Sequence, residues 1–228
     1  MAISPYGWGM KLAEKVHLPK PKGRGLIHLV MSPISLVAGL VLITTADRLQ
    51  GRITLGIFTL TAVTLFTCSA LYHRVKWQEK YRALWRRIDH ANIPILIAGT
   101  YTPFSVYLLN KNQAIILLAC VWGGAILTAL IRILWLGAPR WVYVPLYIAL
   151  GWAAVFFLPT FWQSGGVAVF LLILLGGIFY TAGGIIYAIK KPNISINWFG
   201  FHELFHALTA AAFVSHFVAA VLVVYLNK

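Results

Sequence analysis

The chain of 228 residues alternates between long apolar runs and short polar links. A helix of about 20 apolar residues is long enough to cross a hydrocarbon core of roughly 30 Å. The links contain the glycine, proline, asparagine and basic residues that typically follow a helix at a membrane surface. The pattern predicts an all-α, seven-transmembrane helix bundle, with spans at residues 26–46, 53–73, 88–109, 114–135, 141–161, 167–189 and 201–226.

The segment before the first run, residues 1–25, has a different character. Trp8, Leu12 and Val16 recur every four positions, while Lys11 and Lys15 lie on another face. This spacing favours a short helix on the membrane surface, with a disordered tail as the alternative. Since no link is long enough for a second folded domain, the chain divides into this basic interfacial segment and a transmembrane domain over residues 26–228.

Composition agrees with a membrane protein and changes the interpretation of the charge. Hydrophobic residues make up 60% of the chain and charged residues only 11%, against about 25% charged in a soluble domain. The formal net charge is +14, which in a soluble protein would suggest nucleic acid. Here the basic residues lie in the links, so we expect membrane lipids and no nucleic acid as partners.

The distribution of basic residues predicts an orientation. The amino-terminal segment and every second link together hold fifteen of the 19 lysines and arginines, and the other side holds Arg48, Arg52, Lys111 and Lys228. Cytoplasmic links carry the excess of basic residues in membrane proteins. We therefore expect a multi-pass protein of the plasma membrane, in bacteria the inner membrane, with a cytoplasmic amino terminus and an external carboxyl terminus.

This topology brings several polar residues to one depth. His73 ends the second run, Asp89 begins the third, and His202 and His206 begin the seventh, all near the cytoplasmic edge. Ser69 lies one turn deeper than His73 on the same face. His202 and His206 are four residues apart, so on a helix their side chains lie about 6 Å apart on one face. The sequence therefore predicts one site built from three helices.

Three histidines plus a water molecule form a typical catalytic zinc site. We expect His73, His202 and His206 to bind Zn²⁺, although a set of neutral nitrogen ligands also suits copper or nickel. Asp89 would orient the water or a ligating imidazole. Ser69 would donate a hydrogen bond to the same water or to a substrate carbonyl.

The other membrane histidines are expected outside this ligand set. His216 is ten residues beyond His206, or roughly 15 Å deeper, and we interpret it as an interhelical hydrogen-bonding residue. His28 receives the same interpretation. His90 points about 100° away from Asp89 around its helix, which excludes it from the predicted ligands.

The letters His202-Glu203-x-x-His206 also match the zincin motif, in which Glu203 would be a general base. An intramembrane metalloprotease is therefore an alternative enzyme. Glu203 is rotated about 100° from His202 on a helix, and the motif still needs a third ligand.

At these residues the sequence resembles the progestin and adipoQ receptor family, most closely its bacterial hemolysin III branch. The resemblance rests on Ser69-x-x-x-His73, Asp89 and residues 99–103 (Gly-Thr-Tyr-Thr-Pro), and on His202-x-x-x-His206 with His216. It implies seven helices and a cytoplasm-side zinc held by His73, His202 and His206, with Asp89 reaching the metal through water. Receptor members resemble lipid-amide hydrolases of the ceramidase type, and the bacterial branch is associated with cytolysis and membrane lipid homeostasis.

Two classes of function follow from these residues and this resemblance. The first is a zinc-dependent hydrolase that acts on a lipid amide or ester, with Asp89 and Ser69 as its catalytic residues. The second is a non-enzymatic membrane protein, either lipid-sensing or cytolytic, with a structural zinc that clamps three helices together. Water at the fourth metal position would favour the hydrolase, whereas direct coordination by Asp89 would favour the clamp.

Overall fold

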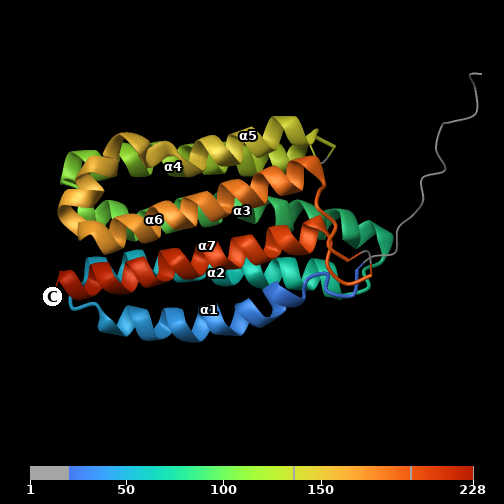
Figure 1. Ribbon diagram of the computed structural model, residues 1–228, viewed down its shortest axis with the longest axis horizontal. Helices are drawn as coiled ribbons and strands as arrows, with labels where there is room; N and C mark the ends of the chain where they lie inside the picture. The colour runs from blue at the N-terminus through green and yellow to red at the C-terminus, as the bar shows by residue number, and fades with distance from the viewer. Residues whose placement is uncertain (1–20, 136, 196, 228) are drawn as a thin grey trace, which may run out of the picture.

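A computed structural model describes residues 21–135, 137–195 and 197–227. This part of the chain contains helices and no β-strand, which confirms the predicted all-helical class (Figure 1). The predicted surface helix around Trp8 and Val16 lies outside the described residues. The elements are α1 (Leu26–Thr45), α2 (Leu49–Arg74), α3 (Glu79–Leu108), α4 (Lys111–Leu134), α5 (Arg140–Gly151), the 3₁₀ helix η1 (Ala153–Phe157), α6 (Leu158–Ile189) and α7 (Phe201–Leu226).

The outer surface of the bundle is apolar. Val37, Leu60, Ile116 and Leu127 are each more than 60% exposed, and a soluble protein rarely leaves so many large apolar side chains in water. Within the described residues, five stretches are long and apolar enough to cross a membrane: α1, α2, α4, residues 140–189 and α7. The chain is therefore a bundle of membrane helices, as the sequence predicts.

Helix α3 extends beyond the apolar run from which it was predicted. It begins at Glu79, although the run begins at residue 88, and six charged residues fall within positions 79–89. Hydropathy locates the part of a helix that suits hydrocarbon, whereas the helix itself continues into the polar interface. The polar first turns bring Asp89 and His90 to the same end of the bundle as the beginning of α7.

Residues 140–189 run along the bundle and back again. Helix α5 ends at Gly151, η1 follows, and the region labelled α6 contains Gly166 at φ 72°. Only glycine adopts this backbone conformation readily. The chain reverses near this position at the end of the bundle that also holds the carboxyl terminus (Figure 1), so two antiparallel helical segments meet at Gly166.

The segment from Gly99 to Pro103 joins α3 to its neighbours. A Cβ atom at Gly99 would overlap the side chain of Thr61, so this glycine allows α2 and α3 to approach closely. The Tyr101 hydroxyl donates to the Gly151 carbonyl at 2.5 Å, where the break between α5 and η1 frees that group. Trp122 Nε1 donates to the Thr102 hydroxyl at 3.2 Å. The segment therefore has a clear packing role.

One end of the bundle collects the basic residues. Here α2 and α4 end and α1, α3, α5 and α7 begin (Figure 1). We call it the basic end, defined by Arg74, Arg82, Arg86, Arg87, Arg140, Lys190 and Lys191. All the predicted site residues lie towards this end.

Candidate metal centre

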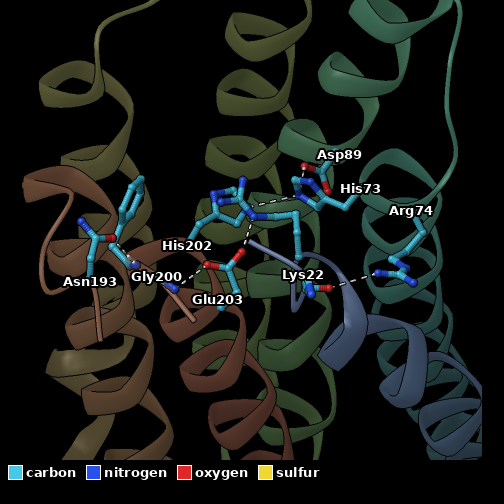
Figure 2. Close-up of polar contacts among 10 residues, drawn as sticks. Lys22, His73, Arg74, Asp89, Asn193, Gly200, His202 and Glu203 are labelled. Carbon is cyan, nitrogen blue, oxygen red and sulfur yellow. Dashed lines mark hydrogen bonds and ion pairs between the residues drawn. The ribbon is translucent and has the colours of Figure 1, made fainter. Parts of the chain in front are cut away.

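Three histidines converge at the basic end. His73 lies in the last turn of α2, and His202 and His206 lie in the first two turns of α7. Their nearest ring nitrogens all lie within 4.8 Å of one another, and the Nε2 atoms of His73 and His202 are 3.2 Å apart (Figure 2). The structure thus brings together the three residues that the sequence predicts as ligands.

The beginning of α7 is held in place by two polar side chains. Asn193 Oδ1 accepts the backbone N–H of Phe201 at 3.0 Å, and Glu203 Oε2 accepts that of Gly200 at 2.8 Å (Figure 2). The first N–H groups of a helix have no partner within the helix, so such side chains fix its first turn. This first turn carries His202, and its position therefore depends on Glu203 and Asn193.

Glu203 has a second partner, Arg24. Its carboxylate is fully buried and forms an ion pair with the Arg24 guanidinium. Arg24 belongs to a short segment, residues 21–25, which we call the strap because it crosses from α7 to α2. The strap also contacts the backbone at residues 197 and 198 and the side chain of Arg74.

Hydrogen bonds on both sides of the strap bring it against His73. The N–H of Lys22 donates to the Asn197 carbonyl at 2.9 Å, and Arg74 donates to the Lys22 carbonyl at 3.3 Å. Gly25 has φ 77°, and a Cβ atom there would lie 2.6 Å from the Cβ of His73. The strap is therefore packed directly against one predicted ligand.

Asp89 and Ser69 lie beside the histidines. The Asp89 carboxylate, 8% exposed, has Oδ2 at 3.8 Å from Nε2 of His73. Ser69 is 2% exposed, and its hydroxyl forms a hydrogen bond with the Asp89 carboxylate. Both residues are where the sequence predicts them, close to the histidines but distinct from the three-histidine set.

The fourth histidine of this region, His28, packs against the set. Its ring lies parallel to that of His206, with centroids 3.8 Å apart and planes at 9°. His28 comes from the first turn of α1 and is 2% exposed. The sequence predicts only an interhelical contact for His28, because nothing in it shows which face of α1 meets α7.

The donor set fits zinc. With Zn–N bonds of about 2.0–2.1 Å, two nitrogens of a tetrahedral site lie roughly 3.3 Å apart. The observed 3.2 Å between His73 and His202 matches this distance. His206 is 2% exposed, and its Nδ1 has no hydrogen-bonding partner among the described residues. His73 and His206 are buried and His202 is half-buried, and three imidazoles with their ring nitrogens this close together suit a divalent ion.

A cavity opens from this cluster into the bundle. Ser69, Asp89, His202 and His206 line one end, and the remaining wall is mainly aliphatic and aromatic. The cavity offers about 120 Å³ to the centres of water molecules. It follows α7 as far as His216, which is fourteen residues or about 21 Å from His202.

Two further histidines are held by protein groups. His216 Nε2 lies 3.1 Å from the Ile173 carbonyl of α6, which confirms its predicted interhelical contact. His90 Nδ1 lies 2.9 Å from Nη2 of Arg132, and His90 is not part of the histidine cluster. The sequence gives no signal for the Arg132 contact, because the two residues are 42 positions apart.

The zincin interpretation finds little support in this arrangement. Both carboxylate oxygens of Glu203 are engaged, one by Arg24 and the other by the Gly200 N–H. A general base needs an accessible oxygen directed at the reacting water. Glu203 therefore acts here as a helix-capping and ion-pairing residue.

Known proteins provide an independent comparison. A family model described as Haemolysin-III related matches residues 16–217. A Hemolysin-3 homolog of Bacillus subtilis (strain 168) is 33% identical over 135 residues, which cover 59% of this chain and 63% of that protein. Hemolysin-3 of Bacillus cereus is 29% identical over 169 residues, which cover 73% of this chain and 77% of that protein. The match to the B. subtilis protein thus spans just under two thirds of its length.

The family model covers most of the chain and includes every residue of the histidine cluster, Asp89 and Ser69. The motifs Ser69-x-x-x-His73 and His202-x-x-x-His206 resemble the same family. The chain belongs to the haemolysin-III-related branch of the progestin and adipoQ receptor family.

Proposed function

We propose that this protein is a zinc-dependent membrane hydrolase that cleaves a long-chain lipid amide or ester. The observation that carries the proposal is the position of the polar cluster at one end of an otherwise apolar cavity. A metal that only clamps helices needs no such cavity. A lipid hydrolase needs both the polar group and the apolar space, in contact with each other.

The chain's own groups have separate roles in this proposal. His73, His202 and His206 hold the metal, which when bound polarises a carbonyl group and activates water. Asp89 accepts the proton of the attacking water. The Ser69 hydroxyl donates its one hydrogen bond to Asp89 before substrate binds, and to the substrate carbonyl once that group enters. The strap, whose Gly25 is buried against His73, limits the access of bulk water from the basic end.

The shape of the cavity supports a lipid substrate. Its length along α7, about 21 Å, exceeds the roughly 15 Å that one leaflet contributes to a 30 Å hydrocarbon core. Phe104, Phe161 and Leu158 are among the apolar residues of its wall. A long acyl chain fits this lining, whereas a peptide would leave its backbone groups without partners.

The decisive experiment substitutes Asp89 by Asn, which keeps the size of the side chain but removes the basic carboxylate. Turnover of long-chain amides and esters in liposomes should fall by roughly 10²–10⁴-fold. Zinc should remain bound, with affinity lowered by about 10–100-fold. Asp47→Asn is the matched control, because Asp47 is exposed in the link between α1 and α2, and its turnover should equal that of the wild type.

A structural zinc is the second candidate, and one distance favours it. Asp89 Oδ2 lies only 3.8 Å from His73 Nε2, so a modest rotation would make the carboxylate a fourth ligand. Such a closed site would tie α2, α3 and α7 together. Wild-type protein with stoichiometric zinc, no turnover of any acyl amide or ester, and lower thermal stability after zinc removal would replace the hydrolase by this clamp.

We also propose the seven-span topology of the sequence analysis. Its support is the reversal at Gly166, which divides residues 140–189 into two crossings, and the apolar part of α3 beyond His90. The basic end then lies in the cytoplasm of a bacterial inner membrane. Cysteine labelling in intact cells should mark position 228 from outside and positions 74–87 only after permeabilisation; labelling of both from the same side would contradict the topology.

A further inference from the structure

Arg132 is a buried cation that has no anionic partner in the described part of the chain. It lies near the end of α4 with 1% of its surface exposed, and its Nη2 contacts His90 Nδ1 at 2.9 Å. The guanidinium carbon lies 3.9 Å from the centre of the Tyr143 ring. Its Nε and Nη1 groups have no hydrogen-bonding partner among the described residues.

These contacts do not offset the full energetic cost of burying the Arg132 charge. Arginine remains charged at every pH that a protein experiences, and a buried charge is costly unless it is paired and hydrogen-bonded. The two ion pairs found in the described part of the chain are Arg24–Glu203 and His73–Asp89. Neither involves Arg132, and the ring of Tyr143 satisfies only one face of the guanidinium. An anionic group from outside the chain is needed to pair with the Arg132 guanidinium.

Two more arginines add positive charge near His90, and one of them, Arg140, also donates to the Tyr187 carbonyl and lies over the Tyr187 ring. Arg86 and Arg140, like Arg132, lie close enough to His90 to act on it electrostatically. Arg86 is exposed, Arg140 is half-buried and Arg132 is buried, so positive charge continues from the surface to the interior. Three like charges repel one another when no anion lies between them, and an anion that binds there would relieve the repulsion.

The first turn of α5 adds to this positive potential. Tyr143, which packs on Arg132, lies in that turn, and no side chain caps the helix at Pro139. The free N–H groups at the beginning of a helix favour anions. The cluster also adjoins the cavity, because His90 and Tyr147 line its wall and the Tyr147 hydroxyl donates to the His90 carbonyl at 3.2 Å.

We propose that Arg132, Arg140 and Arg86 form a binding site for a phosphate group beside the cavity, at His90. Arginine's planar fork matches two phosphate oxygens at once. The site lies at the basic end, where lipid headgroups meet the helix ends, so the phosphate is carried by an anionic lipid or reaches the site as the free ion. Arg86 is exposed and Arg140 is half-buried, so the phosphate approaches Arg132 from the surface past these two side chains.

The test measures thermal unfolding of the purified full chain in detergent micelles as each probe is added. The probes are dioleoyl-phosphatidylglycerol, inorganic phosphate, and dioleoylglycerol, which has the same tails without phosphate. A ligand that binds only the folded state, at free concentration L, adds RT ln(1 + L/Kd) to the stability, so the rise of the melting temperature with ligand concentration gives the half-saturating concentration. Phosphatidylglycerol should stabilise the wild type, and Arg132→Gln should raise its half-saturating concentration by about 10–100-fold.

The control and fallback variants keep this test interpretable. Arg82→Gln removes an exposed charge from α3 outside the cluster and should leave half-saturation unchanged. If Arg132→Gln does not fold, Arg86→Gln and Arg140→Gln replace it, each with an expected weakening of about 3–10-fold. Arg140→Lys, which keeps the charge but loses the fork, should bind better than Arg140→Gln.

The outcomes separate the sources of the phosphate. Arginine-dependent stabilisation by phosphatidylglycerol alone assigns a lipid headgroup, and the same dependence with inorganic phosphate assigns the free anion. Stabilisation by dioleoylglycerol as well, or equal half-saturation in wild type and all the cluster variants, overturns the proposal. Since the readout needs neither zinc nor turnover, the test can be repeated with His206→Ala, and its result is independent of the proposed hydrolase.

Discussion

The imidazole ring of His28 lies parallel to that of His206, with centroids 3.8 Å apart and planes at 9°. His28 lies in the first turn of α1 and His206 in the second turn of α7. The stack therefore joins the first and the last helix of the described chain. Because ring orientation decides whether a nitrogen points at a metal, groups that pack against a ligand tune metal affinity. The stack makes His28 a positioning residue for His206.

His28→Ala should lower zinc affinity by about tenfold, because the His206 ring loses the surface that fixes its plane. His28→Phe keeps an aromatic ring in the same place and should retain affinity close to that of the wild type. Competition with a chromogenic chelator measures both constants. Equal loss in the two variants would instead make a His28 nitrogen, rather than its ring face, the important feature.

The purified protein should carry about one zinc ion per chain. His73→Ala, His202→Ala and His206→Ala should each remove most of it, because two imidazoles hold zinc far less tightly than three. His216→Ala should keep its zinc and lose only stability, since His216 contacts the Ile173 carbonyl deep in the bundle. Elemental analysis after dialysis gives the metal content, and full retention in the three ligand variants would refute the site.

The three-histidine cluster is predictable from sequence for a physical reason. Helical periodicity puts His202 and His206 on one face, and the asymmetry of basic residues gives each apolar run a direction. The depth of a residue in the membrane then follows from its position within the apolar run. This places His73 and Asp89 beside His202 and His206. None of these steps requires information about which helices pack together.

Contacts that depend on helix packing were not predictable in this way. The partners Arg24 and Glu203 are 179 positions apart, and His90 and Arg132 are 42 positions apart. Sequence periodicity shows that Glu203 turns away from His202 but not that Arg24 meets it. Likewise, hydropathy marks Arg132 as the edge of an apolar run, although in the structure its side chain points inward and is 1% exposed.

The Arg24–Glu203 pair predicts an order of stabilities. Arg24→Gln leaves a fully buried carboxylate without its cation, and losing one partner of a buried pair costs about 3–5 kcal/mol. Glu203→Gln should cost less, because glutamine can still accept the Gly200 N–H and the Arg24 charge is 20% exposed. Thermal unfolding of the zinc-loaded variants measures the order.

Turnover of Glu203→Gln also tests the protease alternative. If Glu203 only caps and pairs, Glu203→Gln should keep most of its activity at temperatures where it remains folded. A variant that is stable, holds zinc and yet has no activity would instead identify Glu203 as the general base.

Gly25 provides the most local test of the strap. Its φ of 77° is strained for any residue with a side chain, and an added Cβ atom would lie 2.6 Å from that of His73. Gly25→Ala should therefore destabilise the protein by at least about 2 kcal/mol and weaken zinc binding, because His73 or the strap must move.

Gly56→Ala is the matched control for this change. Gly56 lies within α2, and a Cβ atom there meets nothing within 4 Å, so alanine should stabilise the helix by up to about 1 kcal/mol without affecting zinc. The two variants make the same chemical change in opposite surroundings. Thermal unfolding and chelator competition on both would show whether the strap holds His73 in place, and a Gly25→Ala protein with wild-type zinc affinity and stability would show that it does not.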